Sequence, residues 1–239
     1  MIIAQASYDI LMNGFPARGE RGFLGWSTIV LLDTAKGCAL FDTGGIGDRP
    51  GLMAALEKRG IAKEDISTVV LSHLHFDHMA NVECFPKAEI ILHEDEYAYV
   101  QEHGAADPAI STWQVEGLLR APQLSLVSGE LDVFPGIRMI RTPGHSGGHV
   151  SLVMTVDGKR VVLAQDAVKH RGELASCQSA GAFDEMAAAA SIRRIAEMAD
   201  IVIPGHDGPI SIDNGTLNPS ELATEISLTS RPQTYLLET

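Results

Sequence analysis

The chain has 239 residues, of which 45% are hydrophobic and 21% are charged, and its formal net charge is −13. This length and balance suit a globular protein with a full apolar core. Nucleic acids are poor candidate partners, because a phosphate backbone is bound mainly by Lys and Arg, and here acidic residues outnumber basic ones by 31 to 18. A small molecule is the expected partner.

The sequence carries no signal for membrane insertion or export. No stretch reaches the roughly 18 apolar residues that a membrane-spanning helix needs. The segment Met1–Ile10 has neither the basic region nor the long apolar run of a signal peptide. Cys38, Cys84 and Cys177 are odd in number and widely spaced, which argues against a disulfide framework. We expect a cytoplasmic protein with no membrane partner, folded as a single domain over residues 1–239.

Short apolar and β-branched runs bounded by Gly, Asp or Pro recur along the chain and predict strands. In chain order they are Thr28–Leu32, Cys38–Phe41, Thr68–Leu71, Glu89–Leu92, Leu124–Val127, Ile137–Arg141, Val150–Val156, Arg160–Leu163 and Ile201–Ile203. Helices are predicted between some of these strands, at Pro50–Arg59, Glu94–Glu102 and Phe183–Ala199. Two packed sheets covered by helices would suit this pattern.

The densest group of candidate metal ligands follows a predicted strand directly and reads Ser72-His73-Leu74-His75-Phe76-Asp77-His78. Residues two apart on an extended segment point to the same side, so His73 and His75 can bind one ion together. Asp77 and His78 come where the chain would turn into a helix, and they can face a second ion. Imidazole suits zinc, iron, nickel and copper, and a carboxylate adds affinity for hard ions or a bridge.

Three further candidate ligands each stand just past the end of a predicted strand. His145 follows Ile137–Arg141, Asp166 follows the strand that ends at Leu163, and His206 follows Ile201–Ile203. Loops at one edge of a rigid sheet commonly carry catalytic groups. The repeated placement therefore predicts one metal site assembled from distant parts of the chain.

The order of these segments resembles the motif series of the metallo-β-lactamase superfamily. The series runs Phe41-Asp42-Thr43-Gly44, then HLHFDH, TPGH, a lone Asp and PGH. This resemblance implies an α/β fold, a four-layer αββα sandwich with its site in a groove along one edge of the two sheets. It implies two divalent metal ions, with zinc expected and manganese or iron as options. The first ion would be held by His73, His75 and His145.

By the same resemblance, Asp77, His78 and His206 would hold the second ion, and Asp166 would bridge both together with a hydroxide. Asp42 would orient ligands without binding metal. His149 is expected in a supporting or core role. His93, His103 and His170 stand outside any motif and are expected to be ordinary residues.

Such a centre would make the protein an enzyme, a hydrolase in which hydroxide attacks a carbonyl or phosphoryl group. The candidate catalytic residues are Asp77, Asp166 and Lys169. Known β-lactamases of the secreted kind carry Cys where Asp166 stands, and nucleic-acid-processing members need an inserted domain and a basic surface. Glyoxalase II-like thioesterases use a basic C-terminal region, whereas residues 207–239 contain only Arg231 as a base.

The lactonase branch fits the motif and the length best, so a small-molecule ester or lactone is the expected substrate. One position departs from that branch. Lactonases usually carry Tyr three residues past the bridging Asp, and here that residue is Lys169. We expect Lys169 to face the groove and to contact the substrate through charge-assisted hydrogen bonds.

Several alternatives remain open. They are a glyoxalase II-like thioesterase, a persulfide dioxygenase with one iron in the three-histidine site, and a non-catalytic binding protein. The glycine-rich segment Met12–Trp26 could fold over the groove as a lid, form a simple hairpin loop, or make a contact in a homodimer.

Overall fold

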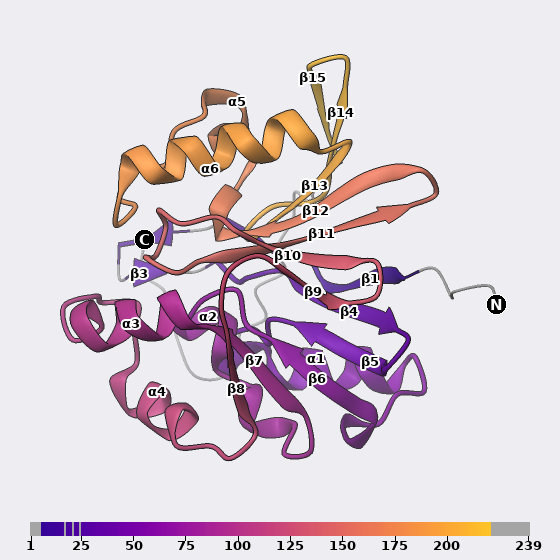
Figure 1. Cartoon of the computed structure of the whole chain (residues 1–239), viewed down its shortest axis with the longest axis vertical. Helices are drawn as coiled ribbons and strands as arrows, with labels where there is room; N and C mark the ends of the chain where they lie inside the picture. Colours follow the sequence, from indigo (N-terminus) through magenta and orange to yellow (C-terminus); the bar gives the residue numbers. More distant parts are fainter. Residues whose placement is uncertain (1–5, 17, 21, 24, 221–239) are drawn as a thin grey trace, which may run out of the picture.

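The computed structural model describes residues 6–16, 18–20, 22–23 and 25–220. Two sheets lie face to face, with helices on the outer side of each (Figure 1). The expected four-layer αββα sandwich is therefore confirmed.

The first sheet has six strands and uses only the first part of the chain. In spatial order they are β1 (Ser7–Met12), β4 (Ile29–Thr34), β5 (Gly37–Phe41), β6 (Ile66–Val70), β7 (Glu89–His93) and β8 (Leu124–Val127). Strands β1, β4 and β5 pair antiparallel, and β5 to β8 run parallel. The carboxyl ends of β5 and β6 consequently meet at one edge of the sheet.

The second sheet has seven strands from the later part of the chain. Its spatial order is β15 (Thr216–Pro219), β14 (Ile210–Asp213), β13 (Ile201–Pro204), β12 (Lys159–Gln165), β11 (Val150–Val156), β10 (Ile137–Arg141) and β9 (Leu131–Phe134). Only β12 and β13 pair in parallel. Strand β11 runs opposite to β10 and β12, so β10, β12 and β13 all end at the same edge. A small hairpin of β2 (Arg18–Gly19) and β3 (Gly22–Phe23) stands apart from both sheets.

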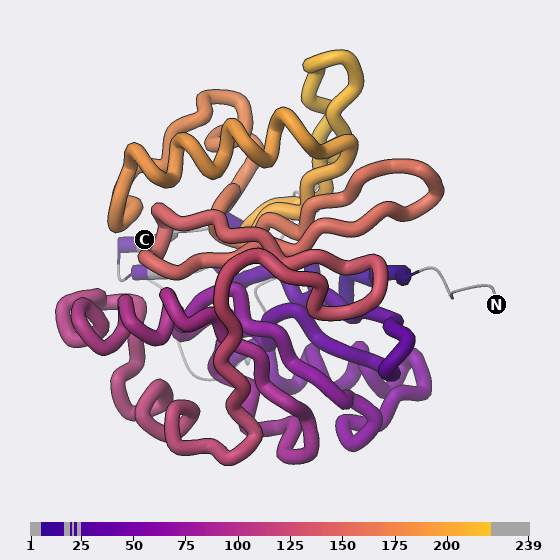
Figure 2. Tube along the Cα trace, viewed as in Figure 1, coloured from indigo at the N-terminus to yellow at the C-terminus, as the bar shows by residue number. Residues whose placement is uncertain are grey.

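Helices cover the outer face of each sheet. Against the first sheet lie α1 (Arg49–Glu57), α3 (Glu94–His103) and α4 (Thr112–Leu119), and α2 (Phe76–Met79) is a single turn at the sheet edge. The second sheet is covered by α5 (Arg171–Ser176) and α6 (Glu185–Met198). The tube trace in Figure 2 shows the same separation by colour, with the indigo to magenta half below and the orange to yellow half above.

Three apolar clusters hold the layers together. In β4 the side chains alternate, so that Leu31 packs toward α1 while Val30 and Leu32 pack toward the second sheet. A third cluster joins the second sheet to α6, where Ile192 and Ile195 are fully buried. Strands buried on both faces read as continuous apolar runs, which is why the sequence pattern located them.

Every predicted strand is present, with ends that differ by at most two residues from the expected ranges. Strands β1, β2, β3, β9, β14 and β15 and helices α4 and α5 were not predicted. The missed strands other than β1 have at most four residues, and β1 has only one buried residue, Leu11, among its six. All three cysteines are free. Among the described residues, no helix has the length and apolar character needed to cross a membrane.

The helix predicted over Phe183–Ala199 starts two residues later than expected. Asp184 caps it by accepting hydrogen bonds from the backbone N–H groups of Met186 and Ala187, both at 3.0 Å. The spacing of apolar residues also suggested that Phe183 and Met186 belong to the buried face of this helix, but their exposed fractions are 51% and 83%. The buried face is made by Ala188, Ser191, Ile192 and Ile195.

Candidate metal centre

The parallel strand ends bring the predicted ligands together at one edge of the sandwich. His73 lies three residues past the end of β6. Asp166 follows β12 directly, and His206 is separated from β13 by Gly205. His145 lies in the loop after β10. Among the described residues, three groups have ligand atoms that all lie within 4.8 Å of one another. Two of them are made of predicted ligands, namely His73, His75 and His145, and Asp77, His78 and His206. The third joins His73 and His78 to Asp42 behind them.

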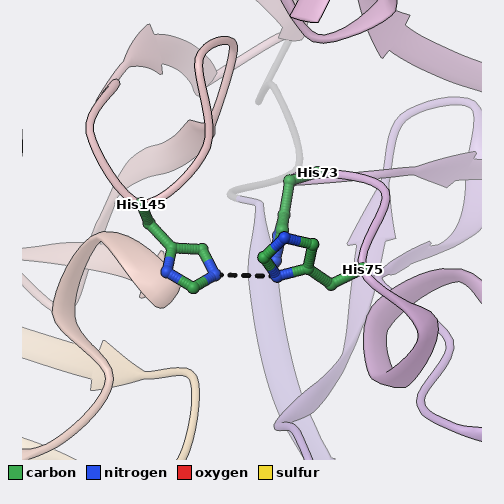
Figure 3. Close-up of side chains that lie close together, drawn as sticks. All are labelled: His73, His75 and His145. Carbon is green, nitrogen blue, oxygen red and sulfur yellow. Dashed lines mark hydrogen bonds between the residues drawn. The ribbon is translucent and has the colours of Figure 1, made fainter. Parts of the chain in front are cut away.

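The three histidines of the first group point toward one another (Figure 3). Nδ1 of His75 lies 3.0 Å from Nε2 of His145. The ring of His73 lies 4.5 Å from that of His75 and 4.8 Å from that of His145, centroid to centroid. This arrangement matches the three-histidine set that the sequence predicts.

Asp166 lies between the two groups. Its Oδ2 atom is 3.2 Å from Nε2 of His145 and 3.3 Å from Nε2 of His206, and its Oδ1 atom is 3.2 Å from Nε2 of His78. Asp77 completes the second group, with Oδ2 3.4 Å from Nε2 of His206. One carboxylate therefore contacts nitrogens from both groups, as a bridging ligand would.

The side chains fit divalent metal ions. Nε2 of His73, Nε2 of His78 and Oδ1 of Asp166 are buried and make no hydrogen bond within the structure. Buried polar atoms are seldom left unsatisfied, and each here faces other ligand atoms. Burial lowers the pKa of His73 and of His145 well below the usual value, which keeps both rings neutral, the form that binds metal.

Asp42 orients two of the histidines, as expected. Its carboxylate accepts hydrogen bonds from the Ser72 backbone N–H at 2.7 Å, the Ser72 hydroxyl at 2.6 Å and Nδ1 of His78 at 2.7 Å. Since the Ser72 hydroxyl donates to Asp42, it accepts from Nδ1 of His73 at 2.8 Å. Both contacts engage Nδ1, so Nε2 is the nitrogen that each ring directs at the centre.

Two other histidines are oriented by groups that sequence reasoning missed. Nε2 of His75 donates to Asp107 at 3.0 Å, and Nδ1 of His206 donates to the backbone carbonyl of Trp26 at 2.9 Å. Asp107 lies in the loop between α3 and α4 with no motif around it. The Trp26 acceptor is a backbone carbonyl, which leaves no trace in the sequence. Neither partner could therefore have been predicted from the sequence.

The backbone is bent tightly at the strand ends that deliver the ligands. Asp42 has φ of 60° and Gln165 has φ of 46°, values that residues with side chains seldom adopt. Gly205 is required next to Asp166, because a Cβ atom at that position would lie 1.9 Å from Oδ1 of Asp166. The ligand loops are therefore packed too closely for larger residues.

A cavity of about 690 Å³ opens beside the centre. Its lining includes metal-centre residues together with Phe15, Tyr99, His103, Lys169, His170 and Phe183. The rings of Tyr99 and Phe183 form one aromatic side of the cavity, and they pack edge to face with their centroids 4.8 Å apart. His103 and His170, which the sequence left without a role, both border this cavity, whereas His93 is buried away from it.

Lys169 lines the cavity, and its ammonium lies 3.2 Å from Oε1 of Glu173. Contact with a substrate stays a prediction.

His149 is fully buried, with Nδ1 2.9 Å from the Thr142 hydroxyl, in keeping with a supporting role. In the segment Met12–Trp26, Phe15 stacks on Trp26 with ring centroids 5.3 Å apart, and Phe15 borders the cavity. Residues 17, 21 and 24 of that segment lie outside the described residues.

A two-sheet sandwich with histidines and aspartates gathered at the sheet edge defines a class of metal-binding enzymes. A family model described as the metallo-beta-lactamase superfamily matches residues 23–206. The chain belongs to this superfamily.

Similar proteins agree with that membership. Metallo-beta-lactamase domain-containing protein 1 of Mus musculus is 32% identical over 219 residues, covering 89% of this chain and 77% of that protein. An N-acyl homoserine lactonase of Bacillus cereus is 30% identical over 161 residues, covering 65% of this chain. The match spans 62% of that lactonase, less than two thirds of its length.

Among solved structures, a variant of AiiA from B. thuringiensis with N-decanoyl-L-homoserine at its active site superposes with a TM-score of 0.67. It is 21% identical, and the match covers 86% of this chain and 94% of that one, which establishes a shared fold. Superfamily membership supports a metal-dependent hydrolase, and the histidine and aspartate groups imply divalent metal ions.

Proposed function

We propose that the protein hydrolyses a small-molecule carboxylic ester or lactone at a centre of two divalent metal ions, with zinc as the expected metal. The observation that carries this proposal is the position of Asp166, whose two oxygens reach nitrogens of both ligand groups at 3.2 to 3.3 Å. A complete second group argues for two ions, whereas a one-iron oxygenase would need only the three histidines.

When bound, a pair of divalent ions supplies Lewis acidity and makes hydroxide available near neutral pH. The chain's own residues do the rest. His73, His75 and His145 would hold one ion, and Asp77, His78 and His206 would hold the other. Asp166 would hold the two positions together and is placed to take up a proton as the bond breaks.

Lys169 would bind the substrate beside the centre. Glu173 is 6% exposed in its side chain and pairs with the Lys169 ammonium, so the two charges offset each other. An ammonium has three donors, and Glu173 takes one, which leaves others for a carbonyl oxygen or a developing oxyanion. Lys169 would then serve in place of the lactonase tyrosine.

The cavity suits a substrate with an apolar part. Its volume of about 690 Å³ falls within the range of small-molecule sites, and aromatic rings form one side of it. Lactonases are among the named relatives at about 30% identity. These features support a lactone or ester of modest size over a macromolecular substrate.

Metal analysis combined with a hydrolysis screen tests the proposal. Protein purified without chelator should contain close to two divalent ions per chain, and it should cleave some members of a panel of lactones and carboxylic esters. Thioester cleavage alone would favour the thioesterase alternative. A single iron per chain with no hydrolysis would overturn the proposal and favour the oxygenase.

A further inference from the structure

Glu96 is a buried carboxylate that the proposed mechanism does not use. It lies in the first turn of α3 and is fully buried, yet no Lys or Arg pairs with it among the described residues. Burying a carboxylate is costly unless hydrogen bonds compensate it. A glutamate kept there without a cationic partner needs a physical reason.

The compensation comes entirely from the two loops that carry the three-histidine group. Oε1 of Glu96 accepts a hydrogen bond from the backbone N–H of Leu74 at 3.0 Å. Oε2 accepts from the hydroxyl of Ser146 at 2.7 Å and from the backbone N–H of Gly148 at 3.1 Å. Leu74 stands between His73 and His75, and Ser146 directly follows His145.

The His145 loop is also pressed onto the backbone of α3. A Cβ atom at Gly148 would lie 1.8 Å from the backbone nitrogen of Glu96, so only glycine permits this approach. The contact fixes the distance between the loop and the helix. The carboxylate then fixes the direction of both loops, one through each oxygen.

We infer that Glu96 is a positioning residue that ties the His73–His75 segment to the His145 loop and so sets the geometry of the three-histidine site. This inference rests on the proposed metal centre. The loops that carry the second group, Asp77, His78 and His206, donate none of the hydrogen bonds that Glu96 accepts, so this group should not depend on Glu96.

Substitution by glutamine separates this role from simple packing. An amide has nearly the shape of a carboxylate, but its NH₂ group cannot accept a hydrogen bond. Whichever way the amide turns, the backbone N–H of Leu74 or of Gly148 faces another donor. Glu96→Gln therefore releases one loop. Glu94→Gln removes an exposed carboxylate from the same helical turn and is the matched control.

The test is a titration of the metal-free, full-length protein with Zn²⁺ in competition with a chromophoric chelator, and with Co²⁺ followed by its visible spectrum. Glu96→Gln should weaken one of the two sites by about 10- to 100-fold and alter the Co²⁺ spectrum of that site. The affected site should be the one lost in His145→Ala and retained in His206→Ala. Glu94→Gln should match the wild type at both sites.

If Glu96→Gln does not fold, Ser146→Ala carries the test, because it removes only the hydroxyl donor and leaves the carboxylate in place. It should weaken the same single site. Wild-type affinity at both sites in these variants, or equal weakening of both sites, would overturn the inference alone. Failure of the wild type to bind any metal would overturn the proposed function, and the inference with it.

Discussion

His75 and Asp107 are joined by a hydrogen bond of 3.0 Å between Nε2 and Oδ2, which leaves Nδ1 of His75 facing His145. The same Oδ2 atom accepts a hydrogen bond from the Tyr99 hydroxyl at 2.8 Å. Burial raises the pKa of Asp107, but the hydrogen bond and charge interaction with His75, together with the hydrogen bonds from the Ala109 backbone N–H and the Tyr99 hydroxyl, outweigh burial and hold that pKa well below its ordinary value. Asp107 is therefore ionised and fixes both the tautomer and the direction of His75.

Asp107→Ala should lower both metal affinity at the three-histidine group and the specificity constant by about 10- to 100-fold. Tyr99→Phe should have a smaller effect, since it removes one hydrogen bond to Asp107 and leaves its charge. Metal titration and steady-state kinetics measure the two quantities. Asp132→Asn, an exposed aspartate distant from the centre, is the control, and a wild-type result for Asp107→Ala would contradict the orienting role.

Asp166→Ala should abolish most hydrolysis, with a loss of roughly 100-fold or more, while the fold stays intact. The side chain is 4% exposed and contacts nitrogens of both ligand groups, so no neighbour can replace it. Activity assays, metal content and circular dichroism should be measured on the same sample. Two retained metal ions with near-normal turnover would show that Asp166 is not the bridge.

Lys169→Met should lose at least about tenfold in specificity constant, which equals roughly 1.4 kcal/mol of transition-state binding. Lys169→Arg should keep more activity, because it retains a cationic donor. Glu173 keeps its hydrogen bonds from the Lys169 backbone N–H and the Ser179 hydroxyl in both variants, so stability should change little. Melting temperatures check that point, and equal activity of the two variants would place Lys169 outside the substrate site.

Glu130 gives a prediction about pH and stability that is separate from catalysis. Paired hydrogen bonds of 2.6 and 3.0 Å from the Arg194 guanidinium join α6 to the segment before β9, and they lower the pKa of Glu130. The folded-state pKa thus lies below the unfolded-state value, so the pair stabilises the fold above that unfolded value. The stabilisation is lost as pH falls through the folded-state value.

Glu130→Gln should cost up to about 1 kcal/mol of unfolding free energy at pH 7, because the pair is partly exposed. The difference from the wild type should shrink as the pH drops below about 4.5, the ordinary range for Glu. Urea unfolding of the metal-free proteins measures it without interference from metal release. Glu116→Gln, which breaks the exposed pair with Arg120, should show neither effect, and a pH-independent Glu130 difference would contradict the assignment.

The sequence located the candidate ligands because metal chemistry favours few residue types, and these stand at similar places past strand ends. Each of the seven predicted ligand residues lies at the centre, and Asp42 lies behind them. The orienting partners of two histidines were not predictable in the same way. Asp107 is an isolated loop aspartate, the Trp26 acceptor is a carbonyl, and only three-dimensional packing brings either to a histidine.

The sequence predicted the strands that carry buried apolar runs, such as β4, β6 and β12, but it missed β1, β9, β14 and β15 and placed Phe183 on a buried helix face. Phe183 shows the reason. Its spacing with Ile192 and Ile195 suggested a buried helix face, yet the helix begins after it, and its ring instead lies against Tyr99 and His103 at the cavity. Periodicity records apolar character and cannot distinguish a core contact from the wall of a binding site.

The two sheets use consecutive halves of the chain, with β1 to β8 before Ser128 and β9 to β15 after Glu130. The two groups of predicted ligands each take two residues from the first half and one from the second, His145 or His206. Neither half alone holds either of these two groups complete. The turn between the halves lies at Gly129, where φ is 64°. Apolar side chains of both halves pack against each other in one cluster, so the same packing that joins the sheets also brings the two parts of each group together. Metal binding would therefore report that the two halves of the chain are correctly packed.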